Sequence, residues 1–223
     1  MVIAIDGPSG VGKSTVSREV AARLGLSYLD TGATYRAATL VVVRAGINPS
    51  SEDAILVELA DHGIDYSEIG ILLDGESVAS DVRSDEVTSH VSEVSAHPRV
   101  RSEIVAMQRQ WVEDKDGDAV VEGRDIGTVV FPDSAVKVYL TASPLVRAIR
   151  RSGDAESSGK SLEEIAAEIE TRDNADSSRK TSPLRPAGDA TVIDTSELGI
   201  DAVVEIIMEL ARPAPTGERD VSD

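Results

Sequence analysis

Residues 2–15 read VIAIDGPSGVGKST, a short apolar strand that runs into a glycine-rich loop and then a helix. Gly7, Gly12, Lys13 and Ser14 fit the pattern G-x-x-x-x-G-K-[ST], in which backbone N–H groups surround phosphate oxygens. Lys13 is expected to reach the outer phosphates, and Ser14 to ligate Mg²⁺. We predict that the loop binds a nucleoside triphosphate, ATP, through Gly7, Pro8, Ser9, Gly10, Val11, Gly12, Lys13, Ser14 and Thr15. The alternative, a glycine turn that only joins strand to helix, is disfavoured by this placement.

Strands and helices alternate along the rest of the chain. Apolar runs predict five strands, at residues 2–6, 27–30, 119–123, 135–143 and 190–195. Helical spacing and glycine or proline boundaries predict helices at residues 13–25, 32–46, 84–96, 98–114 and 201–211. This alternation is typical of an α/β fold, with a central parallel five-stranded sheet and helices on both of its faces.

Three segments depart from the alternating pattern. Strand-like runs on either side of Asp74-Gly75 predict a hairpin, hence a small antiparallel insertion. A glycine- and serine-rich charged segment has no apolar anchor, which predicts a mobile lid that is disordered without ligand near residues 152–160. We expect one compact domain with the following parts: a core at 1–57 and 98–212, the insertion at about 58–97, the lid at about 150–162 and a disordered tail at about 213–223.

Composition narrows the functional class. The net charge of −18 argues against a nucleic acid polymer as partner, because polymer phosphates require a basic surface. A mononucleotide needs only a few arginines in one cleft. The chain contains no cysteine and no run of about 18 apolar residues, and no basic and apolar leader precedes the first strand. We therefore expect a soluble cytoplasmic protein without membrane contact and, by default, a monomer.

Arginine-bearing segments follow two of the predicted strands. DTGATYR at residues 30–36 and EGRDIGTVVF at residues 122–131 lie at the carboxyl edge of the sheet, the same edge as the phosphate loop. RDNADSSR at residues 172–179 adds further arginines to this group. Arg172, Asp176 and Arg179 are spaced so that one helix would present all three on one side.

The chain resembles the bacterial cytidylate kinases, a branch of the nucleoside monophosphate kinases. The resemblance is carried by IDGPSGVGKST, LDTGATYR, HPRVR, VVEGRDIGTVVFPD and RDNADSSR, which span nearly the whole chain in order. It implies a P-loop kinase fold and direct transfer of the γ-phosphoryl group of ATP·Mg²⁺ to the small-molecule acceptors CMP and dCMP. The hairpin insertion likewise resembles the monophosphate-binding subdomain of the bacterial enzymes.

The resemblance also implies roles for individual residues. Asp125 and Arg101, with help from Ser92, would read the cytosine edge. Arg172 and Asp176 would contact the ribose. The acceptor phosphate pocket would contain Asp30, Thr31, Tyr35, Arg36, Arg124 and Arg179. The residues implied to stabilise the transferring group are Lys13, Arg124, Arg147, Arg151 and Arg179. Arg147 and Arg151, together with Arg150, resemble lid arginines that close over ATP.

Less specific interpretations remain open at this point. Asp125 and Arg101 could form a solvated salt bridge, and Arg172 and Asp176 an ordinary ion pair on the surface of a helix. The phosphate loop alone also suits another small-molecule kinase, such as shikimate or dephospho-coenzyme A kinase, or a nucleotide-dependent switch. Thr34 stands where an aliphatic residue is common in the family.

Overall fold

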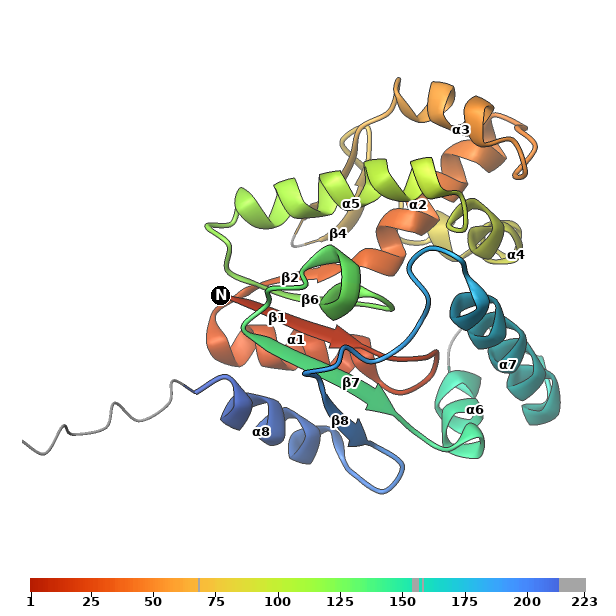
Figure 1. Ribbon diagram of the computed structural model, residues 1–223. Coiled ribbons are helices and arrows are strands. Elements are labelled where there is room, and N and C mark those ends of the chain that lie inside the picture. Colours follow the sequence, from red (N-terminus) through yellow and green to blue (C-terminus); the bar gives the residue numbers. More distant parts are fainter. Residues whose placement is uncertain (68, 154–156, 158, 213–223) are drawn as a thin grey trace, which may run out of the picture.

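The computed structural model describes residues 1–67, 69–153, 157 and 159–212. A central sheet has the strand order β2-β6-β1-β7-β8, and every strand pair in it is parallel (Figure 1). Its strands are β1 (Val2–Asp6), β2 (Ser27–Asp30), β6 (Ala119–Gly123), β7 (Val136–Thr141) and β8 (Thr191–Asp194). The predicted five-stranded parallel sheet is confirmed.

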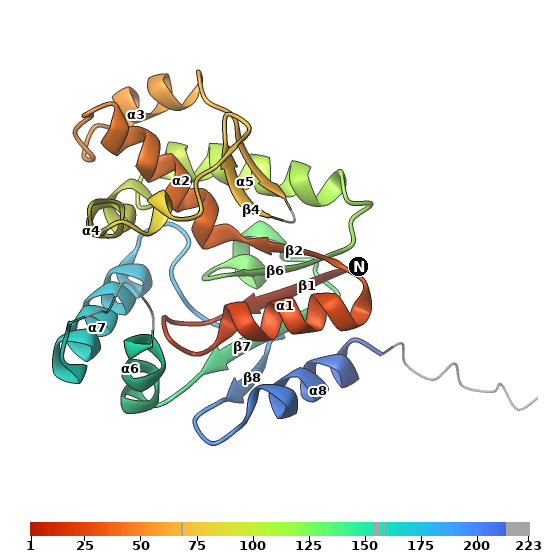
Figure 2. The same cartoon turned by 180° about the vertical axis from the view of Figure 1, so that it is seen from behind.

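Helices cover both faces of the sheet, as predicted. α1 (Lys13–Leu24) and α8 (Ile200–Leu210) lie together on one face (Figure 2). α2 (Thr31–Arg44) and α5 (Pro98–Glu113) lie on the other. Successive strand residues alternate between the two cores, because Ile3 and Ile5 pack toward α1 and α8 whereas Ala4 packs toward α2.

The insertion is a three-stranded antiparallel sheet of β3 (Ile64–Ser67), β4 (Gly70–Leu73) and β5 (Glu76–Ser77). Asp74 and Gly75 form its second turn with φ angles of 53° and 82°, as a two-residue hairpin turn requires. The predicted hairpin is therefore confirmed. Around it lie α3 (Glu52–Leu59), η1 (Asp81–Arg83) and α4 (Asp85–Val94), of which α3 has no counterpart among the predicted elements.

Two further helices, α6 (Pro144–Ser152) and α7 (Leu162–Ser178), pack together through Ala148, Ile165 and Ile169. Residues 154–156 and 158 of the predicted lid, and the whole predicted tail at 213–223, lie outside the described residues. Within the described part of the chain, no helix has the length and apolar character needed to span a bilayer.

Gly7 connects β1 to the phosphate loop where there is no room for a side chain. A Cβ atom on Gly7 would lie 2.3 Å from the carbonyl oxygen of Leu140 on β7. Gly25, which ends α1, differs because a Cβ atom added there would have no neighbouring atom of the described residues within 4 Å. The first glycine of the phosphate loop is thus required by packing against the neighbouring strand.

Replacing Gly7 by Ala should lower the free energy of unfolding by about 3 kcal/mol, because the new Cβ overlaps backbone that cannot move independently. Gly25→Ala is the matched control, with a cost of about 1–2 kcal/mol for its left-handed backbone alone. Chemical denaturation of both variants measures the difference. An equal or smaller loss for Gly7→Ala would contradict the close packing.

Candidate functional site

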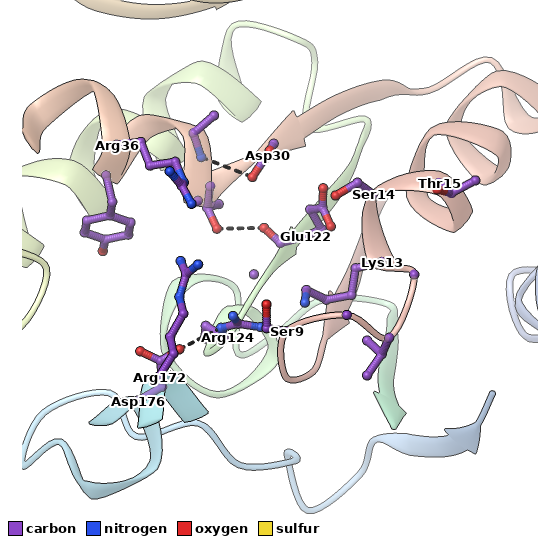
Figure 3. A pocket seen from close by; sticks show the side chains of 18 of the residues that line it. Ser9, Lys13, Ser14, Thr15, Asp30, Arg36, Glu122, Arg124, Arg172 and Asp176 are labelled. Atoms are coloured by element: carbon purple, nitrogen blue, oxygen red, sulfur yellow. Dashed lines mark hydrogen bonds and ion pairs between the residues drawn. The ribbon is translucent and has the colours of Figure 1, made fainter. Parts of the chain in front are cut away.

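A cavity of about 520 Å³ opens at the carboxyl edge of the sheet, between the phosphate loop and α7 (Figure 3). Among the described residues that line it, ten are cationic and four carry a carboxylate. The cationic residues are Lys13, Arg18, Arg36, Arg83, Arg101, Arg124, Arg150, Arg151, Arg172 and Arg179. The acidic ones are Asp30, Glu122, Asp125 and Asp176. In a chain of net charge −18, this cavity is built to attract anions.

The phosphate loop forms one wall of the cavity. Gly12 caps α1 with a left-handed backbone, φ 92°, and no side chain of the described residues caps the first turn of the helix. Those N–H groups and the positive end of the helix dipole therefore remain available to an anion. The Lys13 Nζ atom donates to the carbonyl oxygen of Pro8 at 2.8 Å, which holds the ammonium group over the loop.

Glu122 lies at the end of β6 beside the phosphate loop. Its side chain is buried, and burial raises its pKa while burial also lowers the pKa of the neighbouring Lys13. The Tyr28 hydroxyl donates to Oε1 of Glu122, but Oε2 has no hydrogen-bond partner among the described residues. An unsatisfied carboxylate oxygen near Ser14 is suited to a hard cation (Figure 3).

Arg101 and Asp125 form a buried ion pair that also borders the cavity. Arg101 Nη2 and Asp125 Oδ2 are 2.6 Å apart, and their side chains are only 4% and 6% exposed. The Arg101 guanidinium also lies 5.0 Å from the centre of the Tyr35 ring. The solvated salt bridge considered from the sequence is therefore wrong, and the pair offers a carboxylate and a guanidinium to the cavity in a fixed geometry.

Asp176 on α7 connects two arginines. It accepts from Arg124 Nε at 2.8 Å and from Arg179, and it is 2% exposed. Asp176 is therefore buried, and the alternative of a surface ion pair between Arg172 and Asp176 is wrong. Arg124 also donates to the carbonyl oxygen of Gly7, which joins this cluster to the phosphate loop.

Arg172 carries a positive charge that the site does not fully balance. Its Nε atom has no hydrogen-bond partner among the residues that the structure describes. Burial, followed by repulsion from Arg124 and Arg36, lowers its pKa to about 9. Arg36, Arg124 and Arg172 surround one space facing Lys13 (Figure 3). An anion in that space would relieve their repulsion.

The expected helical alignment of Arg172, Asp176 and Arg179 needs a correction. α7 ends at Ser178, and Arg179 has a non-helical ψ angle of 136°. The chain turns back there, since the N–H of Leu184 donates to the carbonyl oxygen of Asp176. The Arg179 side chain nevertheless returns to Asp176 from outside the helix.

Most of the predicted site residues line the cavity, and three do not. Gly7 and Pro8, at the start of the phosphate loop, do not line the cavity. Arg147 pairs with Asp173, with Nη1 and Oδ2 separated by 2.6 Å. Asp173 also accepts from the N–H of Ser9 at 3.1 Å. Arg147 on α6 is thus connected to the phosphate loop through Asp173 in this structure. The predicted residues that line the cavity are Ser9, Gly10, Val11, Gly12, Lys13, Ser14, Thr15, Asp30, Thr31, Tyr35, Arg36, Ser92, Arg101, Arg124, Asp125, Arg151, Arg172, Asp176 and Arg179.

Asp6 is a structural part of the site that sequence reasoning missed. Its two carboxylate oxygens accept from the N–H groups of Ile126 and Gly127, both at 2.8 Å. Burial raises the pKa of Asp6 to about 6. These bonds hold η2, a single π-helical turn at Ile126–Val130 that directly follows Arg124 and Asp125. A charged residue at the end of a buried apolar strand is the signal that could have identified it.

Further residues line the cavity, among them Arg150, which the resemblance groups with the lid arginines. Arg150 donates to the carbonyl oxygen of Val11 and to Thr195, so it connects α6 to the loop after β8. Leu198 and Ile200 from that loop and the start of α8 also line the cavity. They are ordinary apolar residues at the start of a helix, and only the fold brings them to the phosphate loop.

Comparison with known proteins gives consistent matches over almost the full chain. A family model described as cytidylate kinase matches residues 3–213. Cytidylate kinase from Rhodococcus opacus is 51% identical over 210 residues, which cover 92% of this chain and 91% of that protein. The cytidylate kinase of Corynebacterium efficiens is 49% identical with 94% of both chains covered, and that of Mycobacterium leprae is 48% identical with 95% and 96% covered.

A solved structure also shares the fold. The crystal structure of an uncharacterized protein from Eubacterium ventriosum superposes with a TM-score of 0.51 and 12% sequence identity. The alignment covers 94% of this chain and 96% of that chain. At this identity the likeness concerns the fold alone.

Replacing Arg172 by Met should separate binding from stability. The change removes a charge that burial and repulsion disfavour, so the ligand-free variant should unfold at a temperature equal to or above that of the wild type. The variant should lose most of the stabilisation by CMP, which reaches about 2.7 kcal/mol at a hundredfold excess over Kd in a protein that binds it.

Thermal unfolding with and without CMP measures both effects, with the exposed Arg185→Met as the control that keeps the wild-type response. A lower unfolding temperature together with an undiminished CMP response would show that Arg172 is structural.

Proposed function

The chain belongs to the cytidylate kinase family, whose general reaction is ATP-dependent phosphorylation of CMP, and from that premise we propose that it converts both CMP and dCMP to their diphosphates. The γ-phosphoryl group of ATP would pass directly to the 5′-phosphate of the acceptor. The reaction would serve pyrimidine nucleotide metabolism. From the sequence, we further propose that the protein is cytoplasmic and monomeric.

The observation that supports this proposal most strongly is that two groups of anion-binding residues face each other across one cavity. The uncapped start of α1 and Lys13 form one wall, and Arg36, Arg124 and Arg172 form the other (Figure 3). A protein that only hydrolyses or senses a triphosphate needs the first wall alone. The second wall requires another anionic ligand, as a phosphate acceptor would be.

Positioning and charge stabilisation would perform the chemistry. The attacking atom is an oxygen of an already anionic phosphate, so no strong general base is needed. Lys13 would neutralise the donor phosphates, and Arg124 would lie between donor and acceptor because it contacts Gly7 and Asp176. Holding both polyanions in line removes much of the entropic barrier. Arg179 and Arg151 would stabilise the charge on the transferring group, as would Arg147 if it left Asp173.

The buried ion pair suits cytosine. The exocyclic N4 amino group can donate to Asp125, and Arg101 can donate to the ring acceptors N3 or O2. Ser92 lines the same part of the cavity and would assist. Uracil would instead place its O4 acceptor against the Asp125 carboxylate, leaving both unpaired. Arg172 and Asp176 would contact the ribose, and dCMP is included as an acceptor because the family resemblance implies it.

The residues near the phosphate loop fit a magnesium ion. Ser14 offers a hydroxyl, and Glu122 offers a buried carboxylate oxygen without a partner among the described residues. These two residues would hold the ion, which would neutralise charge on the donor phosphates. Since no three His, Asp or Glu residues of the described chain gather into a metal cluster, most of its remaining ligands would come from the nucleotide and water.

A panel of acceptors tests the proposal directly. Coupled ADP release should be fast with CMP and dCMP, slower with UMP, and at background with AMP, shikimate or dephospho-coenzyme A. Background rates with both cytidine nucleotides would reject the proposal. Faster turnover of shikimate or dephospho-coenzyme A would favour another small-molecule kinase. Slow hydrolysis that no acceptor changes would favour a nucleotide-dependent switch.

Asp125→Ala should reduce kcat/KM for CMP by about 10- to 100-fold more than for UMP, because only cytosine donates to the lost carboxylate. Asp125→Asn is a second variant that avoids leaving Arg101 buried without a polar partner. Steady-state kinetics with both nucleotides measures the effect.

The exposed Asp133→Ala, from the same segment, is the control and should keep wild-type selectivity. Equal losses with CMP and UMP for both Asp125 variants would mean that Asp125 does not read the base.

A further inference from the structure

Ser95 lies between the base-reading pair and the phosphate-binding arginines. It is the residue directly after α4, it is 5% exposed, and it borders the cavity. Its carbonyl oxygen accepts from Arg101 Nη1 at 3.1 Å. Its hydroxyl oxygen accepts from Arg179 Nη2 at 2.9 Å. One small residue therefore contacts an arginine from each half of the acceptor site.

The contacts of Ser95 continue in both directions. Arg101 pairs with Asp125, the residue proposed to read the base. Arg179 pairs with Asp176, which also holds Arg124. Arg124 in turn donates to the carbonyl oxygen of Gly7 in the phosphate loop. An unbroken series of hydrogen bonds thus runs from the base-reading carboxylate to the donor loop, with Ser95 in the middle.

The local backbone fixes the direction of both Ser95 contacts. Ser95 has helical φ and ψ angles of −73° and −7°, and its N–H group donates to the carbonyl oxygen of Val91. Its hydroxyl donates to the carbonyl oxygen of Ser92 at 3.2 Å, which leaves the oxygen lone pairs to Arg179. Because the donated proton is used within α4, Ser95 acts toward the arginines purely as an acceptor.

We propose that Ser95 is a positioning residue that couples recognition of the base to the placement of Arg179. The proposal rests on the proposed function above. A base held by Asp125 and Arg101 fixes the Ser95 backbone, and the Ser95 hydroxyl then holds Arg179 at the acceptor phosphate. An incorrect base that displaces Arg101 also loosens the arginine needed for transfer. Selectivity is thereby expressed in the rate of the reaction as well as in binding.

The two contacts of Ser95 can be separated by mutation. Ser95→Ala keeps the carbonyl oxygen that binds Arg101 but removes the hydroxyl that binds Arg179. Ser89→Ala, within α4, is a matched control, because the exposed Ser89 also donates its hydroxyl to the carbonyl oxygen three residues earlier, that of Glu86. Neither change adds volume to the core.

Steady-state kinetics with saturating CMP and UMP, in wild type and both variants, tests the proposal. Ser95→Ala should lower kcat with CMP about tenfold, the effect of one hydrogen bond to a charged group. Its KM for CMP should stay within about twofold of wild type, because the base-reading pair is intact. With UMP the loss in kcat should be at least about fivefold smaller, since Arg179 is already loosened. Ser89→Ala should match wild type.

Three results would overturn the role of Ser95. These are an unchanged kcat, a loss that is equal with CMP and UMP, or a loss that appears only in KM. Thermal unfolding of Ser95→Ala accompanies the kinetics, and a kcat loss that simply follows a lower folded fraction also counts against coupling. Failure of wild type to phosphorylate either nucleotide would instead reject the proposed function, and the coupling with it.

Discussion

The concentration of positive charge around one cavity is the constraint on which the rest of the structure depends. Ten cationic and four acidic residues line this cavity among the described residues, although the chain as a whole is strongly acidic. Guanidinium groups at such density repel one another, and Arg172 shows it in a pKa lowered by burial and by its neighbours. Asp125 and Asp176 pair with some of these arginines, but the cationic residues of the cavity still outnumber the acidic ones. The proposed triphosphate donor and monophosphate acceptor would supply the missing negative charge.

The arrangement of the sheet makes this possible. β1 and β6 are parallel neighbours, so the phosphate loop and the segment with Arg124 leave the same edge side by side. Asp6 holds the second segment through two backbone N–H groups, and Arg124 holds the first through the carbonyl oxygen of Gly7. The donor and acceptor walls are therefore parts of one connected unit, and the distance between them is set by strand pairing.

Sequence patterns predicted the elements whose signals are local. The phosphate loop, the alternating strands and the turn at Asp74-Gly75 each depend on the backbone preferences of a few consecutive residues. The resemblance added the identity of the acceptor-site residues, and the structure brings most of them to one cavity. Their roles stay proposals, because the contacts of a nucleotide are not visible in sequence spacing.

The features that sequence analysis missed depend on contacts between distant segments. Arg147 was assigned to the transferring group by resemblance, but Asp173 of another helix determines where its side chain lies in this structure. Arg179 was placed on a helix by spacing, but the returning chain after Ser178 ends that helix. The sequence places Glu122 in an apolar strand. Only the fold shows that its buried carboxylate lies beside Lys13.

A crystal structure with cytidine 5′-monophosphate and a non-hydrolysable ATP analogue tests the central claim most directly. The account predicts the acceptor phosphate among Arg36, Arg124, Arg172 and Arg179, with the ribose beside Arg172 and Asp176. It also predicts the cytosine N4 group at Asp125 and the two phosphate groups in line across the cavity. A nucleotide bound outside this cavity, or bound with its base toward solvent and its phosphate away from these arginines, would contradict it.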